Sequence, residues 1–572
     1  MTLLDDQEKR RAPVCWTHSG SKGAAGHRDV QEGVIAGNAD NLQRHLGNRQ
    51  IQLIAIGGSI GTALFVSIGT GLYHGGPGSL FIAFTVQCIF LAMVNNCLAE
   101  MTTAFPVSGG FIRLAGKWVD DALGFMVGWN FFFYEALLIP FEISAFTLVL
   151  SFWSSTITEP GPVAGICAAV TLIYGSLNIL AVKAYGESEF WLSGGKVILI
   201  FSLFFFTFIT MVLSWSIWTP VPLADLKAFW DPFGRLALPS LAPEYISMVA
   251  AEAKRPRIYI KNAFKTVYIR FGLFFIGGSL AVGIVCAAND PQLESVVLGG
   301  SSGSASASPY VIGMRNLGIS IFPSIINALL LTSIFSAGNT YTYCAIRTLY
   351  GLALEGRAPR ILTRTTRSGV PIYCFMVVMI FPLLSFMQVS SSSSIVITWF
   401  ANLVTAGGLI NYIVITLTYI FFHRACKAQG FDRRSLSYFG YLQPYCAYIA
   451  FVWMIVVTIV YGYPAYKPWS LSTFWSDYTM QIVIPPLFII WKVIKKTKFV
   501  KAHEADLVWE RPLIDAYEDS FLDPPTGFWR EMGQMVGIGR KKGGDDRRLS
   551  SVAQPQETTE ELPLEDSFKA HP

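Results

Sequence analysis

The chain has 572 residues, of which 52% are hydrophobic and only 14% are charged, and its mean hydropathy is +0.45. Soluble domains carry about 25% charged residues, so this balance excludes an ordinary soluble protein and indicates a chain that lies largely in a lipid bilayer. The net charge of +5 follows from basic loops between apolar segments, so it does not indicate a nucleic-acid partner.

Eleven apolar segments are long enough to cross a bilayer as helices, because about 20 apolar residues span its hydrocarbon core. In chain order they are 51–72, 79–101, 123–152, 162–182, 190–217, 264–288, 321–345, 372–390, 395–422, 440–462 and 477–494. Together they define a transmembrane domain at 46–498, between an N-terminal tail at 1–45 and a C-terminal tail at 499–572. Each tail is too polar to build a core, so we expect both to be largely disordered.

The basic residues of the predicted loops gather on one side of the membrane. If the N-terminal tail is cytoplasmic, the cytoplasmic loops carry Arg113, Lys117, Lys183, Lys254, Arg255, Arg257, Lys261, Arg357, Arg360, Arg364, Arg367, Arg424, Lys427, Arg433 and Arg434. Cytoplasmic loops of membrane proteins are enriched in Lys and Arg. We therefore predict a multi-pass protein with both termini in the cytoplasm. This orientation requires a twelfth, shorter segment at 236–251 to cross as well.

The first predicted span contains a glycine cluster, Gly57-Gly58-Ser59-Ile60-Gly61-Thr62. Glycine weakens a helix, and a helix broken inside a membrane leaves N–H and C=O groups that lipid cannot satisfy. In transporters, the freed N–H groups at the start of a half-helix bind anionic substrate groups, and freed carbonyls bind cations. The cluster indicates a site for a zwitterion, with close helix packing of the small-xxx-small type as the alternative.

Several motifs follow one another along the chain in a defined order. They are Pro106-Val107-Ser108-Gly109-Gly110, Tyr185-Gly186-Glu187-Ser188-Glu189-Phe190, AAEAKRP at 250–256, Ser308-Pro309-Tyr310, Ser336-Ala337-Gly338-Asn339, Arg347-Thr348-Leu349-Tyr350-Gly351-Leu352-Ala353, Glu355-Gly356-Arg357-Ala358-Pro359 and Gly369-Val370-Pro371. This series resembles the fungal amino-acid permeases of the amino acid–polyamine–organocation superfamily. The resemblance implies an all-α polytopic membrane fold of about twelve helices, with two inverted five-helix repeats of the leucine-transporter type. It also implies proton-coupled amino-acid uptake at the plasma membrane.

The resemblance places the substrate site at Gly58, Ser59, Ile60, Gly61, Thr62 and Glu244. The backbone of this glycine motif is expected to bind the substrate carboxylate at a half-helix N-terminus, and Ser59 adds a hydroxyl donor. The substrate ammonium needs carbonyls or a carboxylate. The family takes these from the unwound parts of the first and sixth spans.

Lys196 lies too deep in the fifth span to reach water easily, so we expect it to face the bundle interior. The resemblance implies that Lys196 reaches the unwound first helix, where its protonation replaces the sodium ion of sodium-driven relatives. The alternative is a structural lysine neutralised by Glu187 or Glu189. Lys196 is therefore a candidate for proton coupling.

Glu135 and Glu142 are the other candidates for proton coupling. They are seven residues apart in the third span and so share one helical face. Intramembrane carboxylates are candidates for proton relay or cation contact, with paired structural carboxylates as the alternative. Glu142 follows Pro140 as in the family pattern, whereas Glu135 is less typical and is a candidate determinant of substrate preference. Asn339, in the eighth span, is expected to hydrogen-bond across helices.

The sixth span departs from the family pattern. The segment 236–251 holds about 16 mostly apolar residues where about 20 are needed, and Pro239 and Pro243 interrupt it. The first half of the family's sixth helix is missing, so we expect a truncated span. Pro239 to Ala251 should enter the membrane as a distorted half-helix against the first span. A truncation here would remove part of the backbone of the substrate site.

The predicted function is amino acid/proton symport at the plasma membrane, with the proton gradient as energy source. No cofactor, metal or catalytic residue is expected, because no metal-ligand cluster or nucleophile motif stands out. The expected partners are an amino acid substrate, protons and the lipid bilayer, with trafficking and ubiquitination machinery as candidates at the tails. The alternatives are a non-transporting permease-like receptor, an inactive paralogue, and a permease for carnitine- or polyamine-type substrates.

Overall fold

The structure, a computed structural model, describes most of the predicted transmembrane domain and the start of the C-terminal tail. The described residues are 44, 46–57, 64–65, 68–180, 182–213, 243–298, 308–366, 369–390, 393–466, 469–521, 527 and 530–531. All of them belong to the unit that runs from Gly37 to Gly543. Within these residues the regular structure is helical, and β-pairing is limited to isolated bridges.

Nine helical segments in the described part of the chain are long and apolar enough to cross a membrane. They are α2 (Ile68–Ala104), α4 (Asp121–Leu150), α5 (Pro160–Leu180), α6 (Val182–Leu213), α9 to α10 (Pro256–Val285), α13 (Phe322–Leu354), Ile372–Val389, α15 (Ser393–Ala428) and α17 (Leu471–Lys495). A shorter apolar helix, α16 (Tyr445–Val460), occupies the predicted span 440–462. The prediction of an all-α polytopic membrane protein is confirmed.

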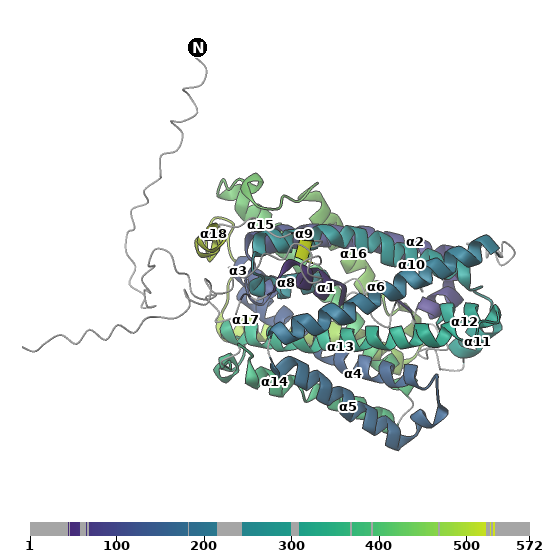
Figure 1. The fold of residues 1–572 in the computed structure, drawn as a ribbon. Helices are drawn as coiled ribbons and strands as arrows, with labels where there is room; N and C mark the ends of the chain where they lie inside the picture. Colours follow the sequence, from purple (N-terminus) through teal and green to yellow (C-terminus); the bar gives the residue numbers. More distant parts are fainter. Residues whose placement is uncertain are drawn as a thin grey trace, which may run out of the picture. The chain divides into compact units, whose positions relative to one another are not determined.

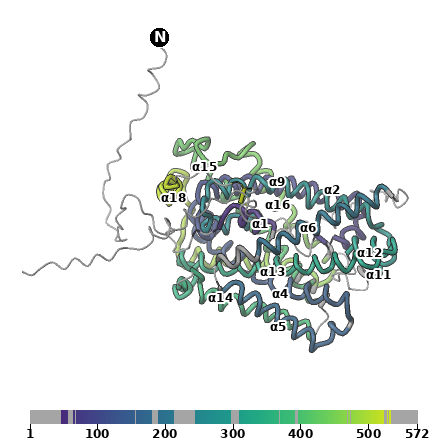
Figure 2. The backbone as a smooth tube through the Cα atoms, viewed as in Figure 1, coloured from purple at the N-terminus to yellow at the C-terminus, as the bar shows by residue number. Residues whose placement is uncertain are grey.

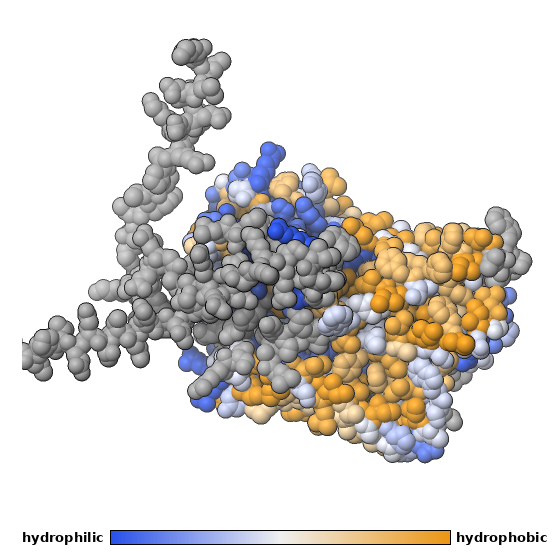
Figure 3. All heavy atoms as spheres, in the orientation of Figure 1, coloured by the Kyte–Doolittle hydropathy of each residue, from blue (hydrophilic) through white to orange (hydrophobic). Residues whose placement is uncertain are grey.

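These long helices run roughly along a common direction (Figures 1 and 2). Hydrophobic side chains cover much of their outer flanks, while hydrophilic side chains gather toward the helix ends (Figure 3). This distribution is the one a bilayer requires, because lipid contacts the flanks and water contacts the ends.

The first two predicted spans are divided differently from the hydropathy pattern. Helix α1 (Asn48–Gly57) ends at the first glycine of the cluster, and α2 begins at Ile68. Inside α2, Gly76 has φ 69° and ψ 170° and Pro77 follows it, so the helix is kinked there. The rest of the predicted carboxylate cradle, residues 58–62, lies outside the described residues.

Helices α4 and α15 lie at the centre of the bundle. In the most apolar part of each helix, 72% of the residues of α4 and 78% of those of α15 are buried, the highest shares among the nine segments. Helix α4 packs mainly against α13 and α15. Gly407 and Gly408 of α15 face Tyr134 of α4, where an added Cβ would lie 3.4 Å from the tyrosine side chain. Small residues therefore let the central helices approach closely, as is usual in membranes.

The described part of the sixth span consists of two short pieces. Helix α8 (Glu244–Met248) is followed by a 3-10 turn at Ala250–Glu252, and all of these residues are buried. Helix α8 contacts α1, as the predicted half-helix should. The question of a truncated first half concerns residues 214–242, which lie outside the described residues.

One end of the bundle, here called the basic end, is held by buried ion pairs. Glu100 of α2 is fully buried and accepts hydrogen bonds from Arg433 Nε at 2.7 Å and Nη2 at 2.8 Å. Tyr419 of α15 and the backbone of Gly440 donate to the same carboxylate at 2.8 and 2.9 Å. Burial alone would lower the pKa of Arg433, but the bonds to Glu100 raise it. This network ties α2 to α15 and to the loop before α16.

The start of the C-terminal tail packs on the basic end, so the expected disorder of 499–572 is wrong for Phe499 to Phe521. Helix α18 (Arg511–Asp519) pairs with the bundle through Asp515 and Arg257 at 2.6 Å. Trp118 of α3 (Gly110–Trp118) donates its indole N–H to the carbonyl of Asp506 at 3.1 Å. Acidic side chains that look solvated in the sequence are thus matched by arginines of the bundle.

We predict that Arg433→Ala destabilises the folded protein by about 3–5 kcal/mol, because it leaves the Glu100 carboxylate buried without its cation. The measurement is thermal unfolding of the purified protein in detergent. Lys501→Ala is the control, since the Lys501–Glu504 pair is exposed (69% and 53%) and worth about 0–1 kcal/mol. Equal melting temperatures for the two variants would contradict the role of the buried network.

Candidate functional site

Buried charged and hydroxyl groups in the centre of the bundle form two separate groups. The first, here called the lysine group, consists of Lys196, Glu142 and Glu189, each at most 1% exposed. Glu189 and Glu142 are the two carboxylates that act electrostatically on Lys196. The structure thus brings together Lys196 and Glu142, two of the three candidates for proton coupling. It also includes Glu189, which the sequence suggested only as a neutralising partner.

Glu189 of α6 is bonded to α13, and its neighbour Ser193 connects the same site to α1. Its carboxylate accepts from Ser336 and, at 3.4 Å, from Asn339, both on α13. The Ser193 hydroxyl of α6 lies 3.0 Å from Glu189 Oε1 and 3.0 Å from the carbonyl oxygen of Leu53 in α1. The expectation that Asn339 bonds across helices is therefore confirmed, and the lysine group is connected to the first span.

The charge balance of the lysine group favours one additional proton. With all three side chains ionised, two carboxylates face one ammonium, which leaves one negative charge in a fully buried site. An uncompensated charge in an apolar interior costs several kcal/mol, so binding one proton stabilises the group. Such a group can take up and release a proton, provided that water reaches it from each side in turn.

Tyr174 of α5 closes the lysine group on one side. Its ring is fully buried and acts electrostatically with Glu142 and Glu189. The ring packs on Gly338 of α13, where an added Cβ would lie 2.7 Å from Tyr174 Cζ. Only glycine fits at this contact, so Gly338, which precedes Asn339 in the sequence, allows α5 and α13 to approach closely.

The second group, here called the carboxylate pair, consists of Glu135 on α4 and Glu244 on α8. Both side chains are fully buried. Glu244 and Tyr245 act on Glu135, whereas Tyr412 donates a hydrogen bond to Glu244 Oε1 at 3.4 Å. Glu135 and Glu142 share a face of α4, but seven residues are about 10 Å along a helix. The predicted proton-coupling set is therefore divided between the two groups.

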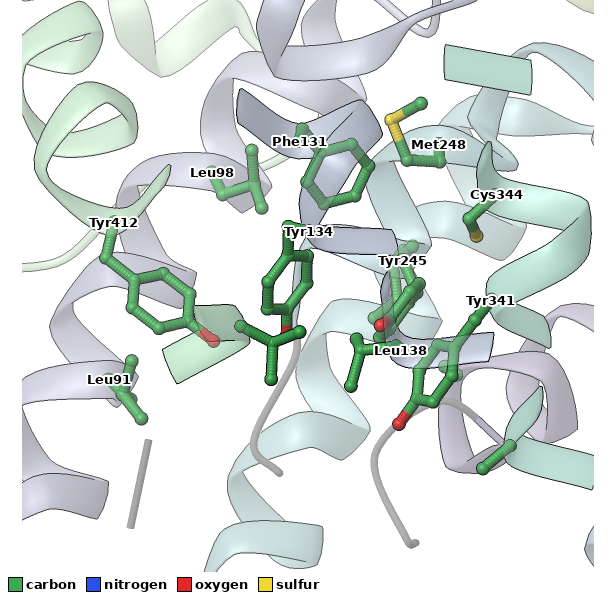
Figure 4. Packing of buried hydrophobic residues seen from close by; sticks show 14 of the residues in the cluster. Leu91, Leu98, Phe131, Tyr134, Leu138, Tyr245, Met248, Tyr341, Cys344 and Tyr412 are labelled. Carbon is green, nitrogen blue, oxygen red and sulfur yellow. The ribbon is translucent and has the colours of Figure 1, made fainter. Parts of the chain in front are cut away.

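Four tyrosines from different helices lie in one part of the core (Figure 4), and each acts electrostatically with Glu135. They are Tyr134 of α4, Tyr245 of α8, Tyr341 of α13 and Tyr412 of α15. None of the four was predicted as part of the site, and Tyr134 was expected to serve packing, although Tyr134-Glu135 and Glu244-Tyr245 are adjacent pairs within apolar segments. A tyrosine beside an intramembrane carboxylate was the available signal, because each buried hydroxyl needs a polar neighbour.

Of the predicted substrate site, the structure describes only Glu244. Its side chain lies in the carboxylate pair rather than in the lysine group. Ser59, Ile60, Gly61 and Thr62, together with Gly58, lie outside the described residues.

An apolar helical bundle that encloses charged and hydroxyl groups at its centre is the architecture of a membrane transporter for polar solutes. Comparison with known proteins defines the class further. The chain matches the amino acid permease family over residues 50–504. It therefore belongs to this family and is an amino-acid transporter, and the resemblance seen in its loop motifs is confirmed.

Several fungal permeases are similar over most of their length. The general amino acid permease AGP2 of Saccharomyces cerevisiae is 40% identical over 504 residues, which cover 83% of this chain and 84% of the relative. A proline-specific permease of Emericella nidulans is 34% identical, covering 86% of this chain and 92% of the relative. The dicarboxylic amino acid permease of Saccharomyces cerevisiae is 33% identical, with coverage of 86% and 84%.

We predict that Gly338→Ala slows transport, because the new methyl group displaces Tyr174 from the lysine group at a cost of about 1–3 kcal/mol. The initial rate of amino-acid uptake at matched surface expression measures this effect. Gly165→Ala is the control, since it lies on α5 with open space around it. Equal rates for Gly338→Ala and the unmodified protein would show that the close contact has no influence on the site.

Proposed function

We propose that this chain is an amino acid/proton symporter of the plasma membrane. The observation that carries the proposal is the lysine group, in which two buried carboxylates face one buried ammonium. One proton completes its charge balance, so a proton gradient can change its state. The hydrogen bonds of Glu189 to α13 and of Ser193 to α1 support a role in coupling, since they join helices that must move relative to one another for alternating access.

The proposed substrate site combines the glycine motif of the first span with the carboxylate pair. Helix α1 ends at Gly57, and the N–H groups of Gly58 to Thr62 would bind the substrate carboxylate. Glu244 is proposed to bind the α-ammonium group of the substrate, because α8 contacts α1 and carries this buried carboxylate. This arrangement supports recognition of the α-amino carboxylate that all amino acids share.

The basic end is proposed to face the cytoplasm. Arg113, Arg257, Arg357 and Arg433 are clustered there with the C-terminal tail, and cytoplasmic loops are enriched in such residues. Both termini would then be cytoplasmic, within reach of trafficking and ubiquitination machinery. The function needs no catalytic residue or cofactor, since the gradient supplies the energy.

We predict that Lys196→Ala abolishes accumulation of substrate against its gradient but leaves exchange of internal for external substrate. Without the ammonium of Lys196, only protons can neutralise Glu142 and Glu189. Both carboxylates then stay protonated throughout the transport cycle, so proton uptake and release no longer accompany substrate movement. Uptake is measured in a permease-deficient cell with and without a protonophore, and Lys265→Ala, an exposed lysine of α9, is the control. A Lys196→Ala variant with an unchanged accumulation ratio and pH dependence would contradict the proposal.

We predict that Gly61→Val blocks substrate binding, because a branched side chain would occupy the proposed carboxylate cradle. The readout is uptake kinetics at wild-type surface expression. Normal kinetics would favour the alternative that the glycine cluster serves helix packing. Absence of uptake by the unmodified chain under every gradient would instead favour a non-transporting receptor.

A further inference from the structure

The carboxylate pair carries buried negative charge that the described residues do not balance. Both oxygens of Glu135 and Oε2 of Glu244 have no hydrogen-bond partner in the described part of the chain. The groups that act on the two carboxylates are each other, Tyr245, Tyr412 and the backbone N–H of Glu244. No described Lys, Arg or His is among them, and Lys196 acts with the other carboxylates.

Two facing carboxylates without a cation are strongly unfavourable in an apolar interior. Like charges at short range oppose each other, and a single shared proton still leaves one negative charge. The pair therefore requires two positive charges from a bound ligand or a proton on each carboxylate. A symporter must bind and release its substrate, and α8 is proposed to contact that substrate. Positive charge supplied by the substrate is therefore favoured over two bound protons.

The aromatic walls of the site also favour a cation. The rings of Phe131 and Tyr134 are 5.9 Å apart, as are the rings of Tyr245 and Tyr341. The faces of such rings attract ammonium, guanidinium and quaternary ammonium groups. The Tyr245 hydroxyl is fully buried, lies near Glu135 and has no hydrogen-bond partner in the described part of the chain. A polar group without a partner at this position is available to a ligand.

We propose that Glu135, with the surrounding tyrosines, binds a second cationic group at the far end of the substrate, while Glu244 binds the α-ammonium group. The permease would then prefer amino acids whose side chain ends in an ammonium, guanidinium or quaternary ammonium group. This inference rests on the proposed transport function and specifies its substrate class. It assigns Glu135 to recognition of the substrate rather than to proton coupling.

Arginine and citrulline provide the test, because they have nearly the same shape and differ in one charge. Each compound competes against uptake of radiolabelled arginine in cells that express the full chain at matched surface levels. We expect the unmodified protein to prefer arginine by about tenfold or more, since a charged partner is lost with citrulline. Glu135→Gln should reduce this preference to near unity. Glu244→Gln, the second variant, should instead weaken both compounds alike, because both carry the α-ammonium group that Glu244 is proposed to bind.

Glu142→Gln is the matched control, because it removes a carboxylate from the same helix two turns away. It should lower accumulation but keep the preference for arginine. Equal affinity of the unmodified protein for both compounds, or a preference retained in Glu135→Gln, would overturn the inference and indicate protons as the occupants.

A binding measurement separates this inference from the proposed function. Arginine and citrulline are added to the purified full chain, and the thermal stabilisation by each is compared. Stabilisation by arginine alone supports the cation site even if uptake proves independent of the proton gradient. Equal stabilisation by both compounds overturns it even if symport is observed.

Discussion

The cost of an uncompensated charge inside an apolar bundle is the constraint on which this structure depends. The described residues meet it in two ways. At the basic end, buried carboxylates have a cation beside them, as in Glu100 with Arg433, in Glu252 with Arg347 at 2.8 Å and in Asp120 with Lys492. Tyr343 donates a further bond to Glu252 at 2.6 Å. At the centre, the carboxylates outnumber the cations.

This difference in charge pairing distinguishes the part of the molecule that stabilises the fold from the part proposed to carry transport. Paired charges fix α2, α13 and α15 relative to the loops and to the docked C-terminal tail. Among the described residues, the lysine group holds two carboxylates and one ammonium, and no cation acts on the carboxylate pair. Sites that are incomplete in this way gain stability from a mobile proton or a charged ligand. We propose that the two groups give one bundle separate sites for the coupling ion and for the substrate.

Composition and segment length were sufficient to predict the helical membrane fold, because lipid allows few alternatives. A carboxylate partner for Lys196 was also predictable, and Glu189 was named as a candidate, since a deep lysine must find a carboxylate. The approach of Glu142 to Lys196 was not predicted. The separation of Glu135 from Glu142 was not, because a shared helical face says nothing about distance along the helix. The tyrosines around Glu135 come from helices far apart in the sequence, so their convergence depends on packing alone. The docked tail was missed for the same reason, as its acidic residues pair with distant arginines.

The most direct test of this account is a simultaneous measurement of proton and substrate flux. The full chain is reconstituted in liposomes that contain a pH-sensitive dye, and labelled arginine is added outside without an imposed pH gradient. The account predicts that arginine entry acidifies the lumen in a fixed proportion to the substrate taken up. Entry of arginine with no change in lumenal pH would contradict the claim that the buried lysine group couples the two fluxes.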